Sequence, residues 1–213
     1  MRPRGARGAG GAASPLGGNR RRAGTPPTEV AETLVVSAPP ERLWAVLSDT
    51  GRYADWVETC EEVTYHHGAA ALGGVYKEVG HGPGPLPVHT TWRVAELQEG
   101  GPRWYRRDTG TGMPLVTALE SIFELEPVGE DGPTAGATRF TWRHRYRPAL
   151  GALGRRIDAL QQGELRAMMR RSMARLAGLV AAEPVATEPV ATEGVGAEPV
   201  ATEVVADPEP EGR

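Results

Sequence analysis

Residues 139–147 read Arg-Phe-Thr-Trp-Arg-His-Arg-Tyr-Arg, and this stretch decides the fold class. Every second residue carries a ring: Phe140, Trp142, His144 and Tyr146. The residues between them are arginines and one threonine. Strict alternation of this kind indicates a β-strand with one face covered by the protein and the other face in water.

The same two-residue period runs through most of the preceding chain. It predicts strands near 57–66, 73–80, 87–98, 102–109, 115–127 and 137–147, after a short β-rich run at 29–37. Turns rich in glycine and proline or in acidic residues separate these segments. Short connections between successive strands favour an antiparallel meander.

The covered faces of these strands need a partner, and residues 150–180 supply it. Their apolar residues recur at spacings of three and four, which predicts one long amphipathic helix. The set is Leu150, Leu153, Ile157, Leu160, Leu165, Met168, Met169, Ser172, Leu176 and Leu179. A helix of this length spans about 45 Å, enough to cross a whole sheet.

Two short helices are expected directly after the first strand. Pro39, Pro40 and Glu41 suit the first turn of a helix, because proline loses no hydrogen bond there and an acid favours the positive helix end. Leu43, Val46 and Leu47 then follow at helical spacing, and Tyr53 and Trp56 are typical of a second short turn.

Together these elements predict an α+β fold: a curved antiparallel sheet of about seven strands around one long C-terminal helix. The sheet must curl around the helix, with the two short helices closing one end. The space between sheet and helix is then wide enough for a mostly apolar cavity, which is the usual form of a ligand site.

The ends of the 213-residue chain differ from its middle. Residues 1–28 contain six arginines, seven glycines and no acid, and 183–213 repeat Glu-Pro-Val-Ala-Thr. Neither segment has enough apolar surface to offset its ordering entropy, so we expect a disordered arm and a disordered acidic tail. Residues 29–182 carry 17 basic and 19 acidic side chains, so they form one domain without the positive field of a nucleic-acid-binding protein.

Several classes of site and location are disfavoured by the composition. The single Cys60 excludes a disulfide framework and a thiolate metal cluster. The adjacent His66 and His67 point to opposite faces of a strand, so no metal site is expected. No cofactor motif and no apolar run long enough for a membrane-spanning helix occurs, and a cytoplasmic location is expected.

The motifs resemble those of a known family. Residues 36–49 read Val-Ser-Ala-Pro-Pro-Glu-Arg-Leu-Trp-Ala-Val-Leu-Ser-Asp, with Tyr53 and Trp56 following, and Phe-Thr-Trp-Arg at 140–143 and Tyr-Arg-Pro at 146–148 lead into the long helix. This pattern is similar to the polyketide cyclase/dehydrase and lipid-transport family of the START-like (SRPBCC, helix-grip) superfamily, over about residues 33–181. The resemblance implies a cavity for a polyketide, lipid or quinone-like molecule, with no metal or cofactor.

Residues on the covered faces are the candidate ligand-binding side chains. They are Trp92, Ser121, Phe123, Trp142, His144, Tyr146, Met168 and Met169. His144 and Tyr146 are also the candidates for a catalytic role, because an imidazole can transfer a proton and a phenol can donate one. Core packing with local hydrogen bonds explains each of these residues equally well.

Three functions therefore remain open. The domain binds a small apolar molecule, or it cyclises or dehydrates a polyketide-like chain in the same cavity, or it is an interaction protein whose interior is filled by its own side chains. A cavity volume well below about 300 Å³ would favour the third. The oligomeric state is not predicted.

Overall fold

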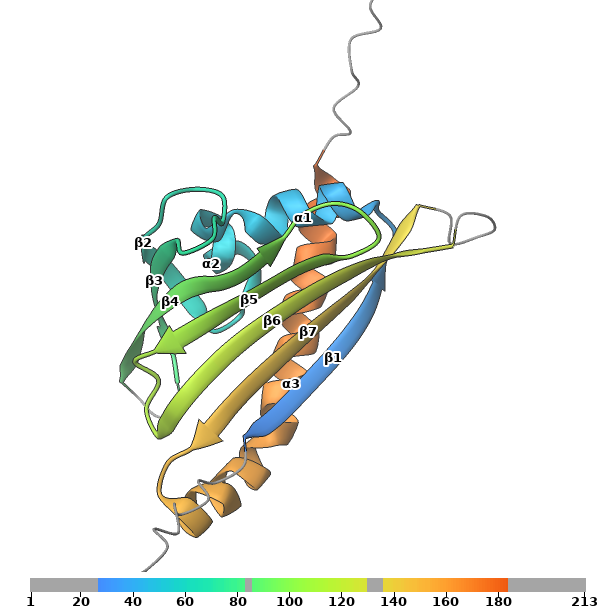
Figure 1. The fold of residues 1–213 in the computed structure, drawn as a ribbon. Helices are drawn as coiled ribbons and strands as arrows, with labels where there is room; N and C mark the ends of the chain where they lie inside the picture. Colours follow the sequence, from blue (N-terminus) through green and yellow to red (C-terminus); the bar gives the residue numbers. More distant parts are fainter. Residues whose placement is uncertain (1–26, 83–85, 130–135, 184–213) are drawn as a thin grey trace, which may run out of the picture. The chain divides into compact units, whose positions relative to one another are not determined.

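The computed structural model describes residues 27–82, 86–129 and 136–183. Its elements are β1 (Thr28–Val36), α1 (Pro40–Ser48), the 3-10 turn η1 (Thr50–Arg52), α2 (Tyr53–Trp56), β2 (Cys60–Tyr65), β3 (Val75–His81), β4 (Pro87–Gln98), β5 (Trp104–Thr111), β6 (Val116–Val128), β7 (Ala137–Pro148) and α3 (Gly151–Ala182). The seven strands form one antiparallel sheet in the order β1-β7-β6-β5-β4-β3-β2 (Figure 1). The predicted α+β helix-grip fold is confirmed.

The strand faces are those that the alternation predicts. On β7, Phe140, Trp142 and Tyr146 are buried, and the arginines between them are exposed or half-buried. Leu119, Ser121, Phe123 and Leu125 on β6 and Val88, Thr90, Trp92 and Val94 on β4 are buried as well. The inner face of the sheet therefore carries the core.

The outer face is held by ion pairs. Glu124 on β6 contacts both Arg143 on β7 and Arg103, which precedes β5. Arg107 on β5 pairs with Glu96 and Glu120 on the strands at either side, at 2.7 and 2.9 Å. This face is wet, as the arginine-rich positions of the sequence predict.

The short helices α1 and α2 lie together at one end of the sheet (Figure 1). Pro40 occupies the first turn of α1, and Leu43, Val46 and Leu47 are fully buried. Trp56, the last residue of α2, is also fully buried and packs on Phe123 and Trp142 of the sheet. These helices close that end of the domain, as predicted.

The long helix α3 crosses the inner face of the sheet (Figure 1), and all of its buried residues except Gly154 lie in its C-terminal half. Met169, Met173, Leu176 and Val180 lie in the core. The prediction that the leucines at the start of the helix face the sheet is wrong: Leu150, Leu153 and Leu160 are 59, 60 and 86% exposed. The helix extends past the packed core, so these positions have no strand to cover them.

The two segments expected to be disordered, 1–28 and 183–213, lie outside the described residues except at their inner edges. Thr28 begins β1, and Glu183 caps α3 through a backbone hydrogen bond to Leu179. The Arg52 and Arg42 side chains both contact Glu183. The folded domain therefore includes both of these residues.

Candidate functional site

The inner face of the sheet and the N-terminal half of α3 enclose a cavity of about 470 Å³. This volume lies within the range of about 300–1,000 Å³ that is usual for small-molecule sites. Aromatic and aliphatic side chains and two methionines make up most of the lining, which also includes the carboxylates of Glu58, Glu78, Asp158 and Glu164. Leu115 and Leu150 line the cavity and are also more than half exposed, so the cavity opens to solvent where they lie.

Seven of the eight predicted site residues line this cavity: Trp92, Ser121, Phe123, Trp142, His144, Tyr146 and Met168. The exception is Met169, which is fully buried in the core and does not reach the lining. One residue along a helix turns the side chain by about 100°. Met168 and Met169 therefore cannot both face the cavity.

The His144 side chain makes no side-chain hydrogen bond to another described residue. It lies on β7 directly opposite Ser121 of β6, and its ring centroid is 5.0 Å from that of Trp142. Burial lowers the pKa of this imidazole from 6.5 to about 4, with a smaller opposing effect from the Glu120 backbone. The ring is therefore neutral near pH 7, and a neutral imidazole both donates and accepts a hydrogen bond.

Tyr146 is more constrained than its position in the sequence suggests. Its hydroxyl donates to the Asp158 carboxylate on α3, which also accepts from Thr28 and from Gln162 at 2.9 and 3.0 Å. Burial, followed by this carboxylate, raises the pKa of the phenol. The proton of Tyr146 is thus held by the protein, which leaves only the oxygen lone pair for a ligand.

Two further polar side chains of the inner wall, Glu78 and Ser121, accept hydrogen bonds from indoles. Trp142 donates its Nε1 proton to the Ser121 hydroxyl at 2.9 Å, and Trp92 donates to Glu78 at 2.8 Å. Burial raises the pKa of the Glu78 carboxyl, which lines the cavity. Cys60 lies beside it, and burial raises the pKa of that thiol to about 12, so Cys60 stays protonated, as an inert cysteine should.

Sequence reasoning missed a buried ionic cluster behind this wall. Arg106 and Asp108 on β5 are both fully buried and form an ion pair. The guanidinium also donates to the Leu47 carbonyl at 3.2 Å, and the Tyr76 hydroxyl donates to Asp108 at 2.8 Å. Two charged residues at alternate positions share one face of a strand, and such a face is ordinarily exposed to solvent. The burial of this pair is therefore seen only in the three-dimensional structure.

The described residues contain no group of three or more side chains arranged to hold a metal ion. Within the same residues, no helix has the length and apolar character needed to cross a bilayer.

Comparison with known proteins shows the family of this chain. Residues 27–181 match the family described as polyketide cyclase / dehydrase and lipid transport. The chain belongs to that family. No curated protein matches it in sequence.

Solved structures share the fold of this polyketide cyclase/dehydrase and lipid-transport domain. A START superfamily protein from Mycobacterium smegmatis is 17% identical and aligns over 71% of this chain and 98% of its own, with a TM-score of 0.55. Truncated norcoclaurine synthase from Thalictrum flavum is 16% identical over 76% of this chain and 99% of its own, with a TM-score of 0.56. Protein CV1439 from Chromobacterium violaceum is 22% identical over 73% and 98%, with a TM-score of 0.53. At these identities the likeness concerns the fold alone.

Proposed function

We propose that this domain binds a small, largely apolar molecule with at least one polar end, of the polyketide, lipid or quinone-like kind, in the cavity between the sheet and α3. The observation that carries the proposal is a cavity of about 470 Å³ whose wall is mostly apolar. A domain that used its interior only for packing would fill this space, since protein interiors are close-packed. The cavity therefore argues against the interaction protein with a filled interior.

Binding is driven by removal of apolar surface from water, at about 25 cal/mol per Å². Trp92, Phe123 and Trp142 offer flat faces that suit an aromatic or quinone ring. His144 offers a hydrogen bond to one oxygen of the ligand from within this apolar wall. The cavity thus fixes both the position and the orientation of a ligand with one polar end.

Calorimetric titration with 2-methyl-1,4-naphthoquinone tests the proposal. We expect saturable binding to the wild-type protein. Leu165→Trp weakens this binding at least about tenfold, because Leu165 lines the cavity and the larger indole ring takes up space that the ligand needs. The matched control is Leu72→Trp, at a 69% exposed leucine outside the lining, which keeps the wild-type affinity. Native mass spectrometry of the purified protein adds a search for a bound small molecule. No saturable binding and no retained molecule would refute the proposal.

A second candidate function is cyclisation or dehydration of a polyketide-like chain in the same cavity. The specific observation in its favour concerns two titratable groups of the lining. Burial raises the pKa of the Glu78 carboxyl and lowers the pKa of the His144 imidazole. A carboxyl with a raised pKa and an imidazole that stays unprotonated near pH 7 give this cavity one candidate acid and one candidate base.

Substitution of His144 separates the two functions. If the domain is a carrier, His144→Ala keeps most of the affinity for the ligand. If the domain is an enzyme that uses this base, the same substitution lowers the rate on a β-ketoacyl chain by about 10²–10⁴-fold. Rate measurement and titration on the same protein distinguish the outcomes.

A further inference from the structure

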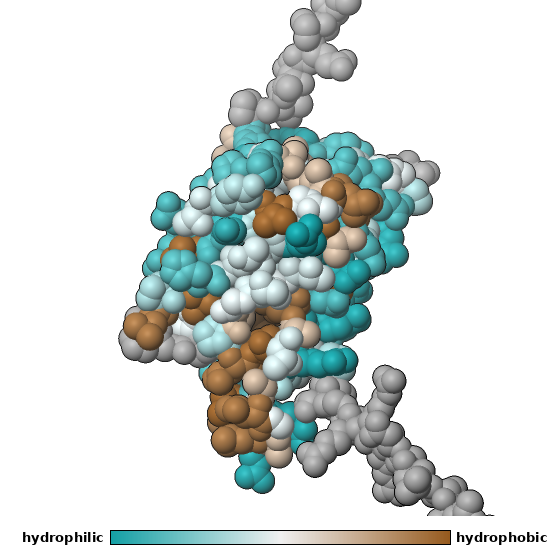
Figure 2. Space-filling view, turned by 60° about the vertical axis from the view of Figure 1, so that its left-hand side comes forward, coloured by the Kyte–Doolittle hydropathy of each residue, from teal (hydrophilic) through white to brown (hydrophobic). Residues whose placement is uncertain are grey.

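Two of the exposed leucines line the cavity, and two more follow on the helix that forms its wall. Among the described residues, six large hydrophobic side chains are more than half exposed: Leu72, Leu86, Leu115, Leu150, Leu153 and Leu160. Leu115 and Leu150 line the cavity, Leu153 and Leu160 follow on the first half of α3, and Leu86 directly precedes β4; we call these five the mouth leucines. Figure 2 shows brown hydrophobic surface concentrated toward the end of the domain where α3 begins. Solvated apolar side chains in one patch mark an interaction surface.

The backbone conformation at Leu115 and Leu150 is unusual. Leu115 and Leu150 are the two described non-glycine residues with positive φ, at 60° and 61°. The amide of Ala149 donates to the Leu115 carbonyl at 2.7 Å, which ties the β5–β6 loop to the start of α3. The left-handed conformation is unfavourable for a residue with a Cβ, and such strain persists where the surrounding structure holds it. Leu115 and Leu150 are thus held in place by the fold.

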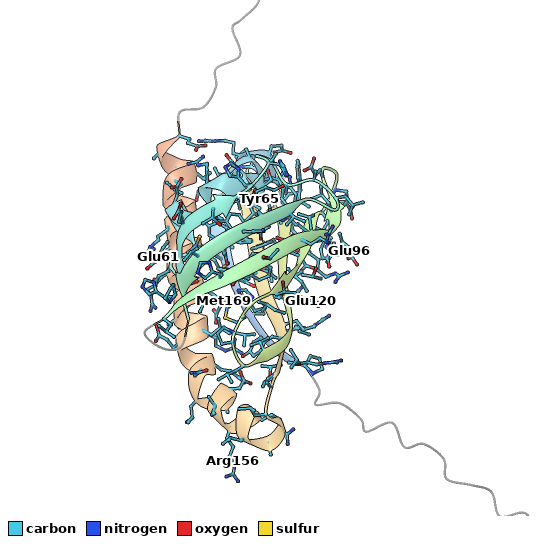
Figure 3. All side chains as sticks on the ribbon, turned by 90° about the vertical axis from the view of Figure 1, so that its left-hand side faces the viewer. Glu61, Tyr65, Glu96, Glu120, Arg156 and Met169 are labelled. Atoms are coloured by element: carbon cyan, nitrogen blue, oxygen red, sulfur yellow. The ribbon has the colours of Figure 1, made fainter. Side chains whose placement is uncertain are left out.

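Arginines without an ion-pair partner among the described residues lie at the end of the domain where α3 begins, outside the cavity lining, whose carboxylates (Glu58, Glu78, Asp158 and Glu164) all accept hydrogen bonds. Arg147, Arg155 and Arg156 are exposed, and none lies within 4.0 Å of a carboxylate in the part of the chain that the structure describes. Figure 3 shows Arg156 at the extremity of α3, pointing away from the sheet. The arginines further along α3 all form ion pairs: Arg166, Arg170, Arg171 and Arg175. Unpaired arginines are therefore a feature of the mouth end of the helix.

The first strand of the domain also begins at this end. Thr28, the first residue of β1, donates to Asp158 near the start of α3 at 2.9 Å. The segment that precedes Thr28 in the sequence contains six arginines and no acid. The acidic residues of 184–213 instead follow Glu183, at the opposite end of the 32-residue helix.

From this combination we propose that the cavity mouth docks on an anionic lipid bilayer. The mouth leucines enter the boundary between headgroups and acyl chains, and Arg147, Arg155 and Arg156 contact the phosphates. Binding to a membrane interface depends on buried apolar side chains together with nearby basic ones. Each arginine close to an anionic surface strengthens this binding. The docked cavity faces the membrane, so an apolar guest passes between bilayer and protein without crossing water.

Sedimentation of the full chain with lipid vesicles tests the role of the leucines. We expect binding to vesicles that mix phosphatidylcholine with anionic phosphatidylglycerol, and at least about tenfold weaker binding by Leu153→Glu/Leu160→Glu. The matched control, Leu72→Glu, changes an exposed leucine away from the mouth and keeps most of the binding. Equal loss in the control and the double variant would overturn the proposal, as would no loss in either.

The arginines are tested in the same assay. Arg155→Glu/Arg156→Glu reduces binding to the anionic vesicles by about tenfold or more. The control Arg93→Glu/Arg139→Glu makes the same change in net charge away from α3 and has the smaller effect. Added salt weakens wild-type binding, because it screens exposed charges. Binding to pure phosphatidylcholine that equals binding to the anionic mixture would overturn the role of charge.

A second copy of the chain is the alternative occupant of the mouth. Light scattering coupled to size-exclusion chromatography distinguishes it: a wild-type dimer that Leu153→Glu/Leu160→Glu converts to a monomer, together with no vesicle binding, overturns the bilayer proposal. Because vesicle binding needs no bound guest, these outcomes are independent of the naphthoquinone titration, and either proposal can fail alone.

Discussion

At the scale of single residues, the buried charges of the inner wall have the largest energetic consequences. Arg106 and Asp108 are held by each other, by the Leu47 carbonyl and by the Tyr76 hydroxyl. A buried ion pair of this kind adds little net stability over a hydrophobic pair, but each charge depends on the other. Removing one partner leaves the second uncompensated.

The first prediction concerns this pair. Arg106→Met lowers the free energy of unfolding by about 3–5 kcal/mol, because Asp108 is left charged in the interior. Urea denaturation followed by circular dichroism measures the change. The double variant Arg106→Met/Asp108→Leu recovers much of the loss, and a single-variant effect below about 1 kcal/mol would contradict the buried pair.

The second prediction concerns His144 and pH. Its pKa in the folded protein is about 4, against 6.5 for the ordinary group, so between these values the unfolded chain binds more protons than the folded one. Stability therefore falls as the pH drops through this window, and the His144 contribution to the loss is about 2–3 kcal/mol. His144→Gln removes that contribution. Urea denaturation at a series of pH values checks this, and an unchanged slope in the variant would disprove it.

At the scale of elements, α3 has two halves with different roles. The C-terminal half is packed into the core, and the N-terminal half forms one wall of the cavity and ends at the mouth. Two glycines mark the difference. A Cβ at Gly154 would lie 1.7 Å from the Ala149 carbonyl oxygen, whereas a Cβ at Gly163 would meet nothing within 4 Å.

The third prediction follows from this contrast. Gly154→Ala destabilises the protein by about 1–3 kcal/mol, because the first turn of α3 must shift away from the β7–α3 loop. Gly163→Ala stabilises it by about 0.5–1 kcal/mol, because alanine restricts the unfolded chain and favours a helix. The melting temperatures of the two variants should therefore move in opposite directions, and a shift in the same direction would be inconsistent with the described packing.

At the scale of the whole molecule, the domain is closed at the end covered by α1 and α2 and open at the end where α3 begins. Charge is also distributed unevenly between the two ends: Arg147, Arg155 and Arg156, which have no ion-pair partner among the described residues, lie at the open end. Ligand uptake and membrane docking, as proposed, therefore use one and the same end of the domain.

The fourth prediction concerns the chain ends. Removal of 1–26 and 184–213 changes the melting temperature by no more than about 2 °C, because these segments have too little apolar surface to contribute to a core. Both Thr28 and Glu183 must be kept, since each contacts the domain. Differential scanning calorimetry of the shortened and full chains compares them, and a large drop would show that one segment packs on the domain.

Much of this protein was determined by the sequence itself. The period of two in 139–147 predicted the strand and its covered face, and the spacing of three and four predicted α3, because these periods follow from backbone geometry alone. The inner-face residues of β4, β6 and β7 that line the cavity followed from the same alternation.

Only the tertiary structure decided the remaining features. It placed Arg106 and Asp108 inside, although charged residues ordinarily face water, because their partners come from α1 and β3. It left Leu153 and Leu160 exposed, because periodicity shows which residues share a helix face but not how far the covering sheet extends. Burial depends on contacts between segments distant in sequence, and no local pattern contains that information.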